Sequence, residues 1–323
     1  MKLSALLLLF AYMASAATEE QINKTFRVAS GGSLVVDVDV GSIEVNTNAA
    51  PGEIAVDVWR KISRRNKDAE ERYFRENPVQ FLPEGNTLTV RCRTKEWNVW
   101  FGGRGNRNEA KYTIHVPAQF NARLNCAGGG IDVGGLTGSV NANTSGGALR
   151  FTRLRGPLNG GTSGGGIRVE DCEGAIKVET SGGGIEVTGG GGSVAGETSG
   201  GGVTVRNFGG PASVETSGVG MTIENVIGGV KASTSGGPIN AVLPSPIPGD
   251  VTLSTSGGGV TVKVPGNAVF DIDAETFGGE VRCDLPVTVQ GRIENGRLKG
   301  SVNGGGPAVV LRSSGGPIHI RKQ

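Results

Sequence analysis

Histidine is scarce in this chain, with only His115 and His319 among its 323 residues. Each alternates with Ile or Val, so both are expected to point away from the apolar face of two separate strands. There is also no His-Glu-x-x-His helix, no Gly-x-Ser-x-Gly elbow and no phosphate-binding loop. The sequence therefore predicts no catalytic residues, no metal site and no cofactor.

A charge of one sign and long apolar runs are missing too. The net charge is +2 with both signs interspersed, which argues against nucleic acid as a partner. After residue 16 no stretch approaches the roughly 20 apolar residues of a membrane-spanning helix. Residues 1–16 join Lys2, a short apolar run and a final Ala-Ser-Ala, which is typical of a secretory signal. We expect a periplasmic, cell-surface or extracellular protein; an uncleaved membrane anchor is the alternative.

Glycine, by contrast, is abundant and unevenly placed. Of 57 Gly residues, 8 lie in residues 17–125 and 49 in residues 126–323. In the second part Thr-Ser-Gly-Gly or a close variant recurs every 18 residues, later at 21, with Cys126 in the first Thr position and Ser313 in the last. The Thr starts are Thr144, Thr162, Thr180, Thr198, Thr216, Thr234, Thr255 and Thr276. This phase predicts a repeat architecture.

Apolar residues share the same phase. They fall five and seven residues after each start, as in Ile167 and Val169, with a second pair near positions 14 and 16. Each unit thus holds two short strands, and stacked units build a continuous core. We predict an all-β parallel β-solenoid (β-helix) of about ten coils, with a buried Thr ladder. An ice-binding Thr surface is the alternative, and Arg321 and Lys322 are expected to protect an open final edge.

Residues 17–125 lack the repeat. Alternating apolar residues predict ordinary strands, and one helix is expected at about residues 66–77, before Pro78. We expect this region to be β-rich and to cap the first coil of the solenoid, which would occupy residues 126–323.

Three segments carry a family resemblance. They are residues 34–45, residues 112–133 and the repeated Thr-Ser-Gly-Gly-Gly-Ile-x-Val. Together they resemble the bacterial putative-adhesin family, exported β-strand-repeat proteins whose domain has no known function. The resemblance implies a β-solenoid outside the cytoplasm, and it supplies no ligand or catalytic residues.

An aromatic and basic segment is one candidate contact surface. Trp97, Trp100, Arg104 and Arg107 concentrate in a Gly-rich stretch, where exposed rings would suit stacking on a sugar or contact with a cell-surface protein. The alternative is a hairpin whose aromatics pack on the first coil.

A column of carboxylates is the second candidate. Glu179, Glu197 and Glu215 each precede a Thr-Ser start, and Glu275 repeats the placement. Stacked about 5 Å apart, they would attract a cation or raise one another's pKa, unless neighbours such as Lys177 compensate them on a solvated face. A calcium roll is excluded because the required Asp position varies among Asp132, Arg150, Arg168, Glu186 and Thr204.

The four cysteines favour buried free thiols. A Cys92–Cys126 disulfide is geometrically possible because the cap adjoins the first coil, whereas Cys172 and Cys283 lie in coils too far apart to bridge. The sequence therefore favours a non-enzymatic, exported binding protein. A carbohydrate-active enzyme of polysaccharide lyase or hydrolase type, using Asp271 and Asp273, and an envelope scaffold are the alternatives.

Overall fold

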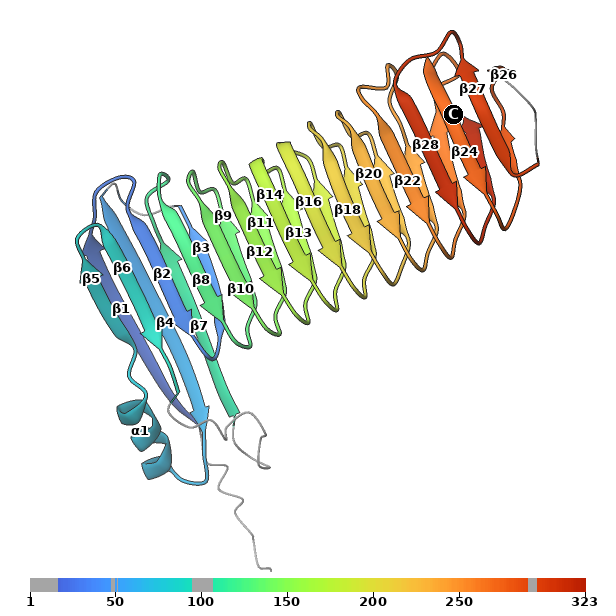
Figure 1. Ribbon diagram of the computed structural model, residues 1–323. Helices are drawn as coiled ribbons and strands as arrows, with labels where there is room; N and C mark the ends of the chain where they lie inside the picture. The colour runs from blue at the N-terminus through green and yellow to red at the C-terminus, as the bar shows by residue number, and fades with distance from the viewer. Residues whose placement is uncertain (1–16, 48–49, 51, 95–106, 290–294) are drawn as a thin grey trace, which may run out of the picture.

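The computed structural model describes residues 17–47, 50, 52–94, 107–289 and 295–323. Within these ranges the chain forms 29 strands and one helix. Two long sheets face each other and form one rod (Figure 1). At about 4.8 Å per strand, the rod is roughly 60 Å long. The predicted parallel β-solenoid is confirmed, since strands of successive coils pair in parallel in both sheets.

The first sheet contains, in spatial order, β1 (Thr18–Arg27), β4 (Glu53–Ser63), β7 (Arg107–His115), β3 (Ser42–Asn46), β9 (Ile131–Gly134), β11 (Leu149–Thr152), β13 (Ile167–Glu170), β15 (Ile185–Thr188), β17 (Val203–Arg206), β19 (Met221–Glu224), β21 (Ile239–Val242), β23 (Val260–Val264), β29 (Ile318–Lys322) and β25 (Val281–Cys283). The second sheet contains β26 (Val287–Val289), β27 (Arg297–Val302), β24 (Phe270–Thr276), β28 (Ala308–Ser313), β22 (Val251–Thr255), β20 (Val230–Thr234), β18 (Ala212–Thr216), β16 (Gly191–Thr198), β14 (Glu173–Thr180), β12 (Leu158–Thr162), β10 (Val140–Thr144), β8 (Asn121–Cys126), β2 (Ser33–Val38), β6 (Thr87–Cys92) and β5 (Gln80–Glu84).

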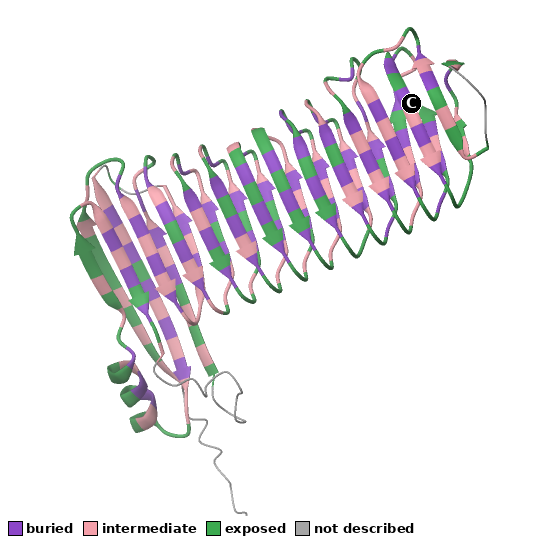
Figure 2. Ribbon diagram, in the orientation of Figure 1, coloured by how far each residue is buried: buried purple, intermediate pink, exposed green. Residues whose placement is uncertain are grey.

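Each regular coil contributes one strand to each sheet. Residues 18 apart are paired, so Ile167 lies beside Ile185 and Ile176 beside Leu158. Buried and more exposed positions alternate along the strands of the regular coils, which appears as stripes in Figure 2. The inward columns form one continuous core between the two sheets. The apolar phase of the sequence therefore sets both the register and the core.

The repeated threonines are buried, at 1–7% exposure. Their hydroxyls donate to a backbone carbonyl of a neighbouring coil, which belongs to a glycine except at Thr234, where it belongs to Val219. Thr180 Oγ1 lies 2.7 Å from the oxygen of Gly165, and it also accepts from the amide of Gly183 at 3.4 Å. Cys126 makes the same pair of contacts with its sulfur, to Gly41 and Gly129. The column is structural, and the ice-binding alternative is wrong because those hydroxyls are not exposed.

The last glycine of each Thr-Ser-Gly-Gly turn sits against the coil before it. A Cβ added at Gly165 would lie 2.1 Å from the carbonyl oxygen of Gly147, whereas one added at Gly164 would lie 3.2 Å from its nearest neighbour. Neither residue has a positive φ. Close approach between coils, rather than a left-handed backbone, therefore favours glycine at Gly165 and its equivalents. The turn after Thr216 is the exception, since Val219 occupies this position there and its carbonyl still accepts from Thr234.

Both ends of the rod depart from chain order. The coil of β2 and β3 lies between that of β6 and β7 and the first regular coil, formed by β8 and β9. At the other end, β28 and β29 lie between β22/β23 and β24/β25. The expectation that Arg321 and Lys322 close an open edge is wrong, because β29 is paired on both sides. At this end of the rod, the second sheet finishes with the antiparallel strands β27 and β26, and the first sheet finishes with the three-residue β25.

The predicted helix is α1 (Lys67–Glu76), and its N-terminal amide at Ala69 is capped by the side chain of Asn66. The buried carboxylate of Glu70 accepts hydrogen bonds from Thr18 in β1 and from the amide of Arg64, and this fixes the helix to the rod.

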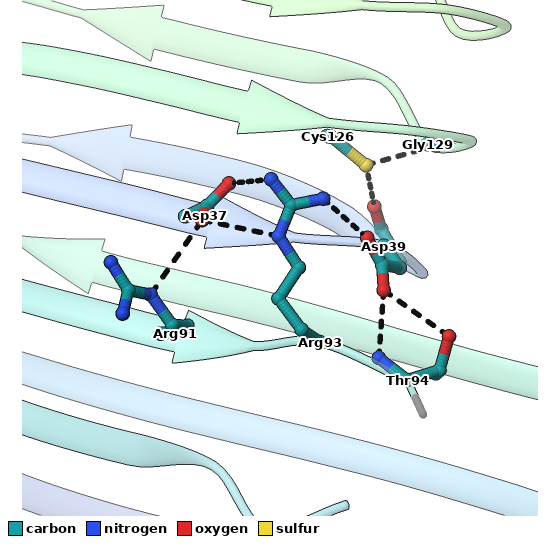
Figure 3. A network of polar contacts seen from close by, with 8 residues as sticks. Asp37, Asp39, Arg91, Arg93, Thr94, Cys126 and Gly129 are labelled. Atoms are coloured by element: carbon teal, nitrogen blue, oxygen red, sulfur yellow. Dashed lines mark hydrogen bonds and ion pairs between the residues drawn. The ribbon is translucent and has the colours of Figure 1, made fainter. Parts of the chain in front are cut away.

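A polar network joins the two coils before β8 (Figure 3). Arg93 bridges Asp37 and Asp39, and the second Asp39 oxygen accepts from the amide of Thr94 at 2.7 Å. The network holds the end of β6 against the end of β2.

Cys92 and Cys126 do not form a disulfide. Both pair with Val38, from opposite sides of β2, so two strand spacings of about 4.8 Å separate their backbones, more than a disulfide allows. All four cysteines are free thiols.

Candidate functional site

A shallow groove of about 870 Å³ runs along the outer face of the first sheet, across seven strands from β7 to β17. Its floor is low because the position just before each strand has a small residue. These residues are Gly130, Ala148, Gly166, Gly184 and Gly202. The groove lies at right angles to the strands, whose backbone groups are already used in the ladders on either side. A ligand lying in it must therefore be recognised by side chains.

Charged side chains from successive coils form a row in this groove, one strand spacing apart. The row consists of Glu44, Asp132, Arg150, Arg168, Glu186 and Thr204. These are the outward positions that lie between the two apolar residues of each repeat strand.

Most charges in or beside the groove are compensated. Lys111 Nζ lies 2.8 Å from Glu44 Oε2. Arg168 contacts Glu170 through Nε at 2.8 Å and Glu186 through Nη2 at 3.1 Å. The hydrogen bond from Lys111 holds the pKa of Glu44 below its usual value. These pairs leave few free charges for a ligand.

Arg150 is different. It is in register with Asp132 on one side and with the already paired Arg168 on the other. Within the described part of the chain its guanidinium makes no ion pair or hydrogen bond. Burial raises the pKa of Asp132, and the positive charge of Arg150 opposes that rise without a direct contact. Arg150 thus offers unused donors to the groove.

On the opposite face, three of the predicted carboxylates come together. Glu179, Glu197 and Glu215 are directly paired on β14, β16 and β18. Lys177 Nζ lies 2.8 Å from Glu179, and this hydrogen bond raises the pKa of Lys177. Shallow hollows of about 160 and 370 Å³ border the column. All three carboxylates are exposed, as expected for a solvated acidic face.

Glu275 lies elsewhere. It is on β24, between Arg312 of β28 and Arg297 of β27. Ser233, Ser254 and Arg312 occupy the three positions that separate it from Glu215. The sequence column therefore has three adjacent members, and Glu275 is flanked by arginines.

The model of the Toastrack DUF4097 family matches residues 33–321. The chain belongs to this family. The predicted resemblance to a β-repeat family whose domain has no known function is thereby confirmed. No curated protein matches this Toastrack chain.

Solved structures match it over nearly its whole length at low identity. One named a putative adhesin from Parabacteroides merdae ATCC 43184 has 10% identity and a TM-score of 0.38, covering 94% of this chain and 96% of the other. One named a putative lipid binding protein from Parabacteroides distasonis ATCC 8503 has 12% identity and a TM-score of 0.37, with coverages of 94% and 96%. One named a putative adhesin from Bacteroides fragilis NCTC 9343 has 12% identity and a TM-score of 0.33, with coverages of 94% and 97%.

The aromatic candidate of this Toastrack protein falls largely outside the described residues. Trp97, Trp100 and Arg104 lie in the undescribed range 95–106. Arg107 opens β7 with an exposed side chain opposite Ser63. The ligand-contact role of these residues stays a prediction.

The carboxylates suggested for an enzyme already have partners. Ser301 Oγ donates to Asp271 at 2.6 Å, and Arg312 pairs with Asp273 at 3.0 Å.

Over the described ranges, no group of three or more His, Cys, Asp or Glu could hold a metal ion. His115 in β7 and His319 in β29 lie toward opposite ends of the rod. Among the same residues no helix is long and apolar enough to cross a membrane.

The sequence did contain the groove row, but only as positions that failed the calcium pattern. Its signal was the charged residue six places after each repeat start, as at Arg150 and Arg168. The lack of a partner for Arg150 could not be read from one sequence, because it depends on side-chain geometry between coils.

Proposed function

We propose that this Toastrack protein is an exported, non-enzymatic binding protein that holds an extended ligand along the groove of its first sheet. Residues 1–16 would direct export and be removed, residues 17–125 would cap the rod, and residues 126–323 would present the repeat surface. The role would be adhesin-like, at the cell surface or within the envelope.

The groove is the observation that carries this proposal. It continues over seven adjacent strands, and its floor contains small residues beside a row of polar side chains. Such a surface suits a long, narrow ligand better than a compact one. Catalysis is not part of the proposal, because the acidic residues Asp271 and Asp273 are engaged by Ser301 and Arg312 rather than lining a cleft.

A bulky residue in the groove tests the proposal. Ala148 is exposed and lines the groove, so Ala148→Trp should fill it without disturbing the core. Asn159→Trp is the matched control, because Asn159 is exposed on the second sheet. Purified mature chains would be mixed with the envelope fraction of the producing organism and sedimented. Loss of binding in Ala148→Trp alone supports the proposal; equal binding by both variants refutes it.

A screen for turnover of acidic polysaccharides separates the enzyme alternative. Turnover by the wild-type chain that disappears in the double variant Asp271→Asn, Asp273→Asn would overturn the non-enzymatic role.

A further inference from the structure

The unpartnered arginine in the groove specifies the chemistry of the ligand. Building on the function proposed above, we infer that the groove binds a linear acidic glycan and that Arg150 holds one of its carboxylates. Arg150 lies at the middle of the charged row, between Asp132 and Arg168. Its planar guanidinium can donate two parallel hydrogen bonds to a carboxylate.

The neighbours of Arg150 make a single anionic group the best fit. Arg168 is held by Glu170 and Glu186, and its charge is largely compensated. Asp132, one coil before Arg150, has no basic side chain in contact with it among the described residues. A ligand with a carboxylate at every step would place one against Asp132 and another near Glu186. A polymer whose acidic units are separated by two neutral, hydroxyl-bearing units avoids both repulsions, because the next carboxylates then lie three strands away, near Thr204 and Lys111.

The remaining groups of the groove suit hydroxyls. Asp132 and Glu186 are acceptors for O–H donors, and Thr204 is both donor and acceptor. The described lining contains no aromatic side chain, so stacking on uncharged sugar rings is not how this surface would gain affinity. An extended peptide would gain no added strand pairing here, because it would cross strands whose ladders are complete.

The experiment measures binding of the mature chain to protease-treated envelope polysaccharide. One portion of the polysaccharide keeps its carboxylates, and in the other they are converted to neutral amides with carbodiimide and ethanolamine. The variants are Arg150→Gln and the control Arg123→Gln. Arg123 is exposed on β8 of the second sheet and makes no ion pair among the described residues.

We expect wild type and Arg123→Gln to bind the native polysaccharide equally. Arg150→Gln should bind at least about tenfold more weakly, as for loss of one charge-assisted contact. Amidation should weaken wild-type binding by a similar factor and leave Arg150→Gln little changed. Rising salt should reduce wild-type binding.

Three results would overturn the inference. The first is unchanged binding by Arg150→Gln. The second is unchanged binding after amidation, which would indicate phosphate or neutral sugar, and the third is loss of binding on protease treatment, which would indicate a protein ligand. If Ala148→Trp abolishes envelope binding while Arg150→Gln does not, the groove function stands and the acidic-glycan inference fails. If Ala148→Trp also binds normally, both fail.

Discussion

Two adjacent glycines of one turn should differ sharply in their tolerance of a methyl group. In Gly165→Ala the new Cβ would lie 2.1 Å from the oxygen and 2.4 Å from the carbon of Gly147. In Gly164→Ala the nearest atom would be 3.2 Å away. The same Gly147 carbonyl accepts the hydroxyl of Thr162 at 2.8 Å, so the first substitution cannot be relieved without disturbing that buried bond.

The expected magnitudes follow from these contacts. Overpacking costs about 1–3 kcal/mol, and a disturbed buried hydrogen bond adds roughly another 1–3 kcal/mol. Gly165→Ala should therefore lower the free energy of unfolding by about 3 kcal/mol or more. In Gly164→Ala, the lower conformational entropy of the unfolded chain stabilises the protein by about 0.4–1 kcal/mol and offsets the mild contact. The free energy of unfolding of this variant should therefore stay within about 1 kcal/mol of wild type.

Urea unfolding followed by circular dichroism gives the comparison. Because solenoids can open locally, amide hydrogen exchange in β10 and β12, whose turns carry Gly147 and Gly165, provides a second measure and should rise selectively in Gly165→Ala. If the two variants have equal stability and equal exchange, coils can separate to admit a side chain, and close packing is not the reason for the glycine repeat.

Changes at four further positions test the ladder and the groove. Thr180→Val should lower stability by about 1–3 kcal/mol, because the Gly165 carbonyl loses its buried donor, while Thr180→Ser should cost less; equal losses in urea unfolding would contradict the ladder. Cys126→Thr should match or exceed wild type and Cys126→Val should be less stable, and the reverse order in thermal unfolding would refute the role given to the sulfur. The folded pKa of Asp132 is raised, so its ionisation lowers the free energy of unfolding as pH rises through that pKa. The stability of Asp132→Asn relative to wild type should therefore be greater at pH 7 than at pH 3. The folded pKa of Glu44 is lowered, so Glu44→Gln should be less stable than wild type at pH 7, and this difference should fade as pH drops through the folded pKa. If the stabilities of the Asp132 and Glu44 variants change with pH in the same direction, both assignments are refuted.

Most of the repeat domain could be predicted from the sequence because each coil repeats its neighbour. The phase of Thr180 and its equivalents fixed which residues face inward, and burial of the whole Thr column agrees. The helix could be predicted from Asn66 and Pro78, and it begins after Asn66.

The ends could not be predicted, because strand order is not encoded in a local pattern. Residues 308–322 have the same alternation of apolar and polar residues wherever they pair. Nothing in the sequence therefore shows that they lie between the coil of β22 and β23 and the coil of β24 and β25. Glu275 is separated from Glu215 by Ser233 and Ser254, which the sequence shows, and by Arg312 of the inserted coil, which it does not. In the candidate site, the missing partner of Arg150 depends on contacts between coils.

The inserted coil of β28 and β29 affects how the rod is assembled. Coils up to β22 and β23 can be added in the order in which the chain emerges, each on the one before. Residues 270–283 cannot dock there directly, since β28 and β29 must occupy that place first. Folding of this end must therefore wait for residues 308–322. Because β28 and β29 connect β24 to β27 to the rest of the rod, local unfolding of β28 and β29 would detach all four strands together.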